Sequence, residues 1–68
     1  MSLKIRDWLI AARKNKKLTQ QEVAEKLGVT RISYSRYETG ERTPRPSTAE
    51  KIESLLGVNK EYFFWNPQ

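Results

Sequence analysis

Two helix-start signals only eleven residues apart constrain this chain more than any other feature of its sequence. The Thr19 hydroxyl can accept a hydrogen bond from the Glu22 amide while the Glu22 carboxylate reaches back to the Thr19 amide, which forms a capping box. Thr30 is placed to cap a second helix, and Gly28 between them can adopt the left-handed conformation that ends the first. The sequence therefore predicts two short helices joined by a tight turn, over residues 20–27 and 31–38.

Periodic apolar residues predict three further helices. From Ile5 to Ala12 they recur at the spacing of one buried helical face. A second capping box, from Ser47 to Glu50, precedes another apolar face, and Asn59 can cap a last short helix. We therefore expect an all-α, five-helix fold, with these helices at about 3–15, 47–56 and 60–65.

Length and composition narrow the class of protein. The 68 residues have room for one domain, spanning 1–68, and the absence of Cys and His excludes disulfides, a structural zinc site and a His-based catalytic triad. No nucleophile has a neighbouring base, so we expect no enzyme, and equally no metal, cofactor or small-molecule ligand. The sequence has neither an apolar run near the roughly 20 residues of a membrane span nor a signal peptide. These absences favour a cytoplasmic protein with no membrane partner.

The distribution of charge suggests a partner. Thirteen basic and eight acidic residues give a net charge of +5, which suits a polyanion but would also suit a merely soluble basic surface. In a helix over 31–38, Tyr34 and Tyr37 share the inner face, whereas Ile32, Ser35 and Arg36 point the opposite way. That outward face has no acidic residue. A helix that enters the groove of DNA requires this absence, because a carboxylate there would be repelled by the phosphates.

Two short helices joined through a glycine form a helix-turn-helix unit, whose second helix enters the major groove of DNA. Arg36 can donate two hydrogen bonds to guanine. Ile32 can cover a thymine methyl group, or it can be an ordinary exposed apolar residue. Arg31 stands at the helix N-terminus, where it can reach either bases or phosphates.

Phosphate contacts are expected around this reading helix. The helix over 20–27 opens with two glutamines, where free backbone amides and the positive end of the helix dipole favour an anion. The loop that follows Gly40 has a second polar and basic cluster. The expected phosphate contacts are Gln20, Gln21, Ser35, Arg42, Thr43 and Arg45.

The order of these features resembles the Cro and phage-repressor type of helix-turn-helix domain, the XRE family. The resemblance covers about residues 4–64 and rests on Leu18-Thr19-Gln20, Leu27-Gly28-Val29-Thr30, Ser35-Arg36-Tyr37-Glu38-Thr39-Gly40 and Leu56-Gly57-Val58. It implies five helices, a roughly palindromic operator in double-stranded DNA, and control of transcription, which we expect from a repressor that acts as a homodimer.

Individual roles follow from the resemblance by position. The family's phosphate-contacting glutamine matches Gln20, and its base-reading positions match Arg31, Ile32 and Arg36, with Ser33 as a fourth candidate. An ion pair between Arg13 and Glu38 is also implied. Two positions depart from the family pattern. Glu41 stands where relatives often have a basic residue, which weakens the phosphate role of its loop, and Ile32 replaces an often polar residue, so no relative's base preference can be copied.

A protein-interaction module, such as an antitoxin-like or anti-repressor domain, is the alternative function. Four of the seven aromatic residues stand together near the C-terminus, and one short helix cannot turn all of them inward. We expect a surface for a second copy or another partner among Tyr62, Phe63, Phe64 and Trp65. The acid-free outward face of the helix over 31–38 favours DNA as the partner, and RNA is less expected because no sheet with stacking aromatics is predicted.

Overall fold

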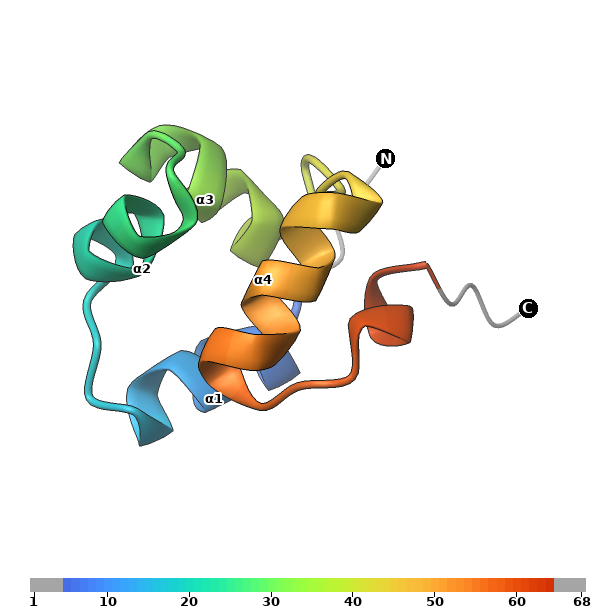
Figure 1. Cartoon of the computed structure of the whole chain (residues 1–68). Helices are drawn as coiled ribbons and strands as arrows, with labels where there is room; N and C mark the ends of the chain where they lie inside the picture. Colours follow the sequence, from blue (N-terminus) through green and yellow to red (C-terminus); the bar gives the residue numbers. More distant parts are fainter. Residues whose placement is uncertain (1–4, 65–68) are drawn as a thin grey trace.

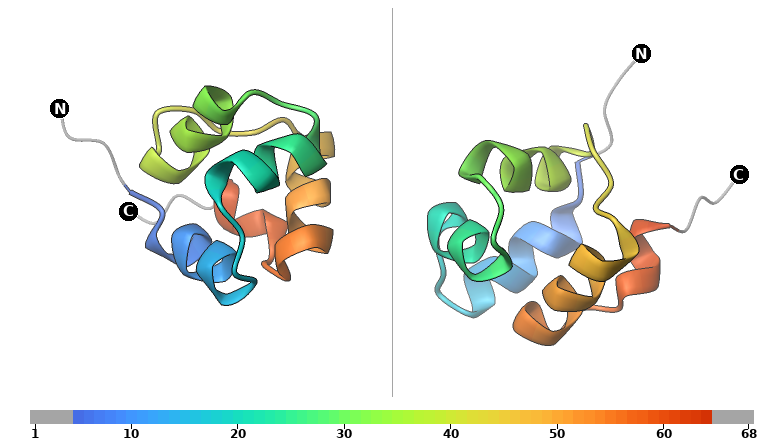
Figure 2. Two further views of the ribbon diagram at one scale, coloured as in Figure 1. Left: turned by 90° about the vertical axis from the view of Figure 1, so that its left-hand side faces the viewer. Right: turned by 45° about the horizontal axis from the view of Figure 1, so that its top comes forward.

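The computed structural model describes residues 5–64, which form four α-helices, one 3₁₀ helix and no β-strand. The elements are α1 (Asp7–Asn15), α2 (Gln20–Leu27), α3 (Arg31–Thr39), α4 (Pro46–Leu56) and the 3₁₀ helix η1 (Lys60–Phe63). Figure 1 shows α2 and α3 side by side with a tight turn between them, while η1 lies next to α4. In both views of Figure 2, α3 lies at the edge of the molecule, which leaves one of its faces open.

The all-helical class agrees with the sequence-based expectation, but a fifth α-helix does not form among the described residues. The segment after Asn59 makes a single turn with i to i+3 bonds, from the Tyr62 amide to the Asn59 carbonyl and from the Phe64 amide to the Glu61 carbonyl. Only Phe63 of η1 is buried in the core. Short helices depend on tertiary contacts for their stability, and here the contacts of Phe63 stabilise the single turn of η1.

The turn between α2 and α3 has the predicted caps. Thr19 and Glu22 exchange the two bonds of a capping box at 3.0 and 2.8 Å. Gly28 ends α2 in the left-handed conformation with φ of 77°, where a Cβ would be strained. The Thr30 hydroxyl then accepts from the Ser33 amide at 3.1 Å and begins α3. These local bonds determine where α2 begins and ends and where α3 begins.

Two helix starts differ from the prediction. Ile5 and Arg6 are not helical, because the Arg6 amide donates to the Glu38 carbonyl at 2.8 Å and draws this segment along the end of α3. Ile5 is consequently exposed and takes no part in the buried face. The Ser47–Glu50 capping box does not form, because α4 begins earlier, at Pro46, whose fixed φ and missing amide suit the first helical position.

The core lies where all five elements meet. Its members are Leu9, Val23, Ala24, Leu27, Tyr34, Tyr37, Ala49, Ile52, Leu56 and Phe63. Leu18 and Val29, which flank α2, pack partly buried against it. Each fully buried Leu, Val, Ile or Phe side chain contributes about 1.5–3 kcal/mol to the free energy of unfolding. Because α3 gives only its two tyrosines and Glu38 to the interior, the rest of its surface is available to a partner.

Candidate nucleic-acid interface

The outer face of α3 has the composition that the helical wheel predicted. Tyr34 and Tyr37 are buried, whereas Arg31, Ile32 and Arg36 are exposed, and Ile32 has 59% of its surface accessible. Ser33 and Ser35 are partly buried. The Ser33 hydroxyl lies 3.0 Å from the Thr30 hydroxyl, so the cap of α3 already engages this candidate base-reading residue.

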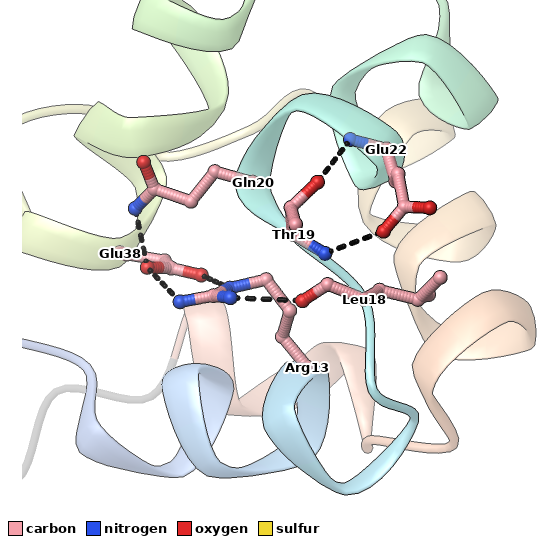
Figure 3. Close-up of polar contacts among 6 residues, drawn as sticks. All are labelled: Arg13, Leu18, Thr19, Gln20, Glu22 and Glu38. Carbon is pink, nitrogen blue, oxygen red and sulfur yellow. Dashed lines mark hydrogen bonds and ion pairs between the residues drawn. The ribbon is translucent and has the colours of Figure 1, made fainter.

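A buried cluster of polar side chains fixes α3 against α1 and α2 (Figure 3). Arg13 Nε donates to Glu38 Oε2 at 2.6 Å, and Arg13 Nη1 donates to the Leu18 carbonyl at 2.9 Å. Gln20 Nε2 donates to Glu38 Oε1 at 2.8 Å. The hydrogen bond with Glu38 raises the pKa of the Arg13 guanidinium, so this side chain stays positively charged in the folded protein. The structure thus places the expected ion-pair partners in contact.

The position of Gln20 bears on its expected role at phosphate. Its amide nitrogen points toward Glu38 from the first turn of α2, while the amide oxygen points away from it (Figure 3). Gln21 donates from its side chain to Glu25 at 3.0 Å. Each of these side-chain amides uses one of its two N–H donors, so a phosphate at this helix end can accept from the second N–H of each glutamine as well as from the backbone amides.

The Tyr34 ring lies beside the cluster of Arg13, Gln20 and Glu38. Burial raises the pKa of its phenol, and the Glu38 carboxylate adds to that effect. Within residues 5–64, its hydroxyl is the one buried side-chain polar atom that lacks a hydrogen-bond partner. The phenol is therefore held neutral inside the fold, where it packs edge-on against Tyr37 with ring centroids 6.2 Å apart.

The loop after α3 is held by Arg6, a residue that the sequence analysis missed. Its Nη1 donates to the Tyr37 carbonyl at 2.6 Å and to the Arg42 carbonyl at 3.0 Å, and its Nη2 donates to the Thr43 hydroxyl at 3.0 Å. Its guanidinium carbon lies 5.2 Å from the centre of the Phe63 ring. Burial lowers its pKa. Two of the three hydrogen-bond partners are carbonyls, which every residue type has, so no sequence pattern marks this site.

Arg6 leaves the polar side chains of the loop turned outward. Arg42, Thr43 and Arg45 are exposed, while Pro44 between them is buried and anchors the loop. Because the Thr43 oxygen accepts from Arg6, its own hydroxyl hydrogen remains free to donate. The three expected phosphate contacts of this loop therefore lie on a fixed backbone.

Glu41 stands at the border between α3 and this loop. Its Oε2 lies 3.9 Å from Arg36 Nε, and the two side chains are each about half exposed. Its Oε1 lies 3.2 Å from the Thr39 hydroxyl. The carboxylate that departs from the family pattern is thus next to the arginine expected to read a base.

The aromatic residues near the C-terminus separate into two groups. Phe63 is buried and packs against Trp8 with ring centroids 5.0 Å apart, so its expected place on a partner surface is wrong. Tyr62 and Phe64 are 53% and 49% exposed. Tyr62 also packs edge-on against Trp8, with ring centroids 5.4 Å apart. Trp65, the fourth member of the expected surface, lies outside the described residues.

Two other kinds of site are absent from residues 5–64. None of the helices in that range is both long and apolar enough to cross a membrane. No three His, Cys, Asp or Glu side chains there gather as a metal ion would need.

Comparisons with known proteins identify the family. A profile of the helix-turn-helix family matches residues 9–63. The uncharacterized HTH-type transcriptional regulator YqaE of Bacillus subtilis is 50% identical over 50 residues, which are 74% of this chain and 43% of that protein. The cryptic phage CTXphi transcriptional repressor RstR of Vibrio cholerae is 40% identical over 57 residues, or 84% and 48% of the two chains.

The HTH-type transcriptional regulator YqaF of Bacillus subtilis matches over more of its length, at 37% identity over 60 residues, or 88% of this chain and 79% of that protein. The chain spans less than half the length of YqaE and of RstR. The matched region contains α2, α3 and the turn between them, with the outer face of α3 exposed. The chain therefore belongs to the XRE-type helix-turn-helix family, whose members are transcriptional regulators that bind double-stranded DNA.

Proposed function

We propose that this protein is a cytoplasmic transcriptional repressor that binds a roughly palindromic operator as a homodimer. The observation that carries the proposal is the outer face of α3, where Arg31, Ile32 and Arg36 are exposed while the one carboxylate of the helix, Glu38, is buried. The naming of one relative as a phage transcriptional repressor supports the sign of regulation.

Base reading falls to the exposed side chains of α3. Arg36 projects from the outer face and can donate to the O6 and N7 atoms of guanine. Ile32 gains most from contact with a thymine methyl group, because water otherwise surrounds much of its side chain. Arg31, at the start of the helix, reaches a base or a neighbouring phosphate. Ser33 is partly buried, and its oxygen accepts from the Thr30 hydroxyl, so its own hydroxyl hydrogen remains for a base.

Phosphates are held on both sides of α3. On one side, the start of α2 offers its backbone amides and the exposed Gln21, with Gln20 partly buried beside them. On the other side, Arg42, Thr43 and Arg45 extend from the loop that Arg6 fixes. Ser35 lies between these two groups. Contacts of this kind set the register of the protein on the duplex and do not depend on base sequence.

Selection of bound duplexes from a random pool, with the whole chain, tests the proposal. We expect a palindromic sequence with a guanine in each half-site. A pool that yields no enriched sequence would contradict the proposal. Arg42→Ala then serves as a comparison variant, because it should weaken operator and scrambled DNA alike and reduce the slope of log affinity against log salt by roughly 0.9 for each phosphate that the variant no longer binds.

Self-association is proposed to cover the exposed aromatic side chains Tyr62 and Phe64, which lie on either side of the buried Phe63. Exposed apolar surface of this kind favours an interface, and a two-fold dimer matches a palindrome. Sedimentation of wild type against a Tyr62→Ser/Phe64→Ser variant measures it, with circular dichroism as the check on folding. A folded wild type that stays monomeric at high concentration, both with and without DNA, would contradict the dimer.

The same aromatic side chains favour the second candidate function, a module that binds another protein. Fold alone does not decide between the two functions. The pool selection separates them, because an interaction module would leave the pool without an enriched sequence.

A further inference from the structure

The loop residue Glu41 is placed where it can act on the reading arginine. The structure assigns Glu41 as a positioning residue for Arg36 that lowers the affinity for DNA in general and raises the discrimination between sequences. This inference rests on the proposed function, since it concerns how α3 reads DNA. It explains why a carboxylate is tolerated at the border of a surface that otherwise favours phosphate.

The backbone fixes Glu41 beside the last turn of α3. Gly40 ends the helix in the left-handed conformation, and the Arg42 amide then donates back to the Arg36 carbonyl at 3.2 Å. The Glu41 amide lies 3.5 Å from the Thr39 hydroxyl, and its Oε1 lies 3.2 Å from the same oxygen. Both the main chain and one carboxylate oxygen of Glu41 therefore lie beside the Thr39 hydroxyl, which can also donate to the Arg36 carbonyl at 3.2 Å.

The second carboxylate oxygen faces the Nε of Arg36, at 3.9 Å. A guanidinium has donors on two edges, one that includes Nε and one formed by the two terminal nitrogens. With the carboxylate near Nε, the edge formed by the two terminal nitrogens remains as a fork for a base. That pair matches the O6 and N7 acceptors of guanine.

The charge of Glu41 acts on every DNA sequence. Non-specific binding depends on attraction between basic side chains and phosphates, and a carboxylate beside Arg36 weakens that attraction. Contact with guanine depends on the geometry of the fork instead, which Glu41 preserves. The carboxylate consequently costs more affinity on random DNA than on the operator, and the ratio between the two rises.

The test compares Glu41→Gln with wild type on the selected operator, on a scrambled duplex, and on operators altered at the base pair that Arg36 reads. Glu50→Gln is the matched control, because Glu50 is also an exposed carboxylate paired with a cation, Lys60, at 3.1 Å, but lies on α4. We expect Glu41→Gln to tighten binding to scrambled DNA by about three-fold and to improve operator binding less. The Glu50→Gln variant should leave the ratio at the wild-type value.

Two further variants separate charge from position. Glu41→Asp keeps the charge but shortens the side chain, so scrambled DNA should bind as weakly as it does to wild type while discrimination at the base pair read by Arg36 falls. In an Arg36→Ala background, Glu41→Gln should no longer change discrimination. Thermal unfolding confirms that each variant is folded, as expected for exposed positions.

The outcomes distinguish this inference from the proposed function. A wild type that prefers no duplex overturns the proposed function and this inference with it. A wild type that selects an operator, together with a Glu41→Gln variant that tightens operator and scrambled DNA by the same factor, overturns the role of Glu41 alone. Loss of discrimination that persists in the Arg36→Ala background would also overturn it.

Discussion

Helix α3 takes part in two arginine–glutamate pairs that differ in almost every physical respect. The inner pair, Arg13–Glu38, has an N–O distance of 2.6 Å, with 12% and 3% of the side chains exposed. The outer pair, Arg36–Glu41, is 3.9 Å apart, with 49% and 46% exposed. Breaking a buried pair leaves a charge without its partner inside the fold, which lowers the free energy of unfolding. In an exposed pair, water solvates each charge once the other is removed, so the effect on stability is small. The same chemistry therefore fixes the helix on one face and positions an exposed arginine on the other.

The largest effect is expected from Glu38→Ala, which breaks the inner pair. Arg13 would lose the carboxylate that its Nε contacts, and Gln20 would lose its acceptor, so the free energy of unfolding should fall by about 3 kcal/mol. Denaturant unfolding measures it, and a double-mutant cycle with Arg13→Ala isolates the coupling. A coupling energy near zero between Arg13 and Glu38 would mean that the inner pair stabilises the fold no more than an exposed pair does.

Arg36→Ala breaks the outer pair and should separate binding from folding. We expect a loss of about 1–3 kcal/mol on the selected operator and relaxed discrimination at one base pair in each half-site. Stability should change by no more than about 0.5 kcal/mol, because the side chain is exposed. Titration against operator and scrambled duplexes, with thermal unfolding in parallel, measures both. Equal binding of every sequence by variant and wild type would show that α3 does not read DNA.

The alkaline limit of stability should depend on Tyr34, which lies beside the inner pair. Burial raises the pKa of its phenol in the folded state, so the folded protein keeps a proton that the unfolded chain releases above pH of about 10. The stabilisation is present below that pH and is lost as the pH rises, by up to about 1.4 kcal/mol per pH unit.

The Tyr34→Phe variant should show a shallower alkaline fall when unfolding is followed from pH 8 to pH 11, values that bracket the ordinary pKa of about 10. At neutral pH the variant should be nearly as stable as wild type, because the hydroxyl has no hydrogen-bond partner among residues 5–64. An unchanged alkaline slope would show that Tyr34 is not the source of the fall.

The smallest effect is expected in the turn that leads to the inner pair. Lys17 has φ of 59°, a left-handed value that is costly for a residue with a Cβ, and the next residue, Leu18, offers its carbonyl to Arg13. Lys17→Gly should raise the free energy of unfolding by up to about 1 kcal/mol. Lys16→Gly, one residue earlier with an ordinary backbone, is the control and should not stabilise. Equal effects of the two changes would point to charge instead of backbone strain.

Much of the fold could be predicted because its signals are local. The caps at Thr19 and Thr30 and the stop at Gly28 fix α2 and α3, and the helical period places Tyr34 and Tyr37 inside. The errors come from tertiary contacts. The segment at Ile5 and Arg6 lies along the end of α3 because the Arg6 amide donates to the Glu38 carbonyl. A hydrogen bond between two backbone groups leaves no signal in the sequence.

The candidate site was predictable to the same extent. The outward face of α3 follows from the helical period, since exposure there depends on α3 alone. Gln20 was assigned to phosphate, yet its amide nitrogen faces Glu38, because a buried carboxylate with two oxygens accepts a donor from α2 as well as from α1. Phe63 and Tyr62 are neighbours of one chemical class and both pack against Trp8, so only their exposure in the folded chain shows which is buried.

The way in which Arg6 holds the loop has a consequence for how this surface can change. Two of its hydrogen bonds end on the carbonyls of Tyr37 and Arg42, which stay in place whatever side chain the loop residue carries. Substitution at Arg42 can therefore change the strength of the proposed phosphate contact while the loop keeps its shape. Position 6 has no such freedom, because no other side chain combines the reach, the fork of donors and the flat face against Phe63. The molecule thus separates a scaffold position that resists mutation from exposed loop side chains that can vary while the fold is kept.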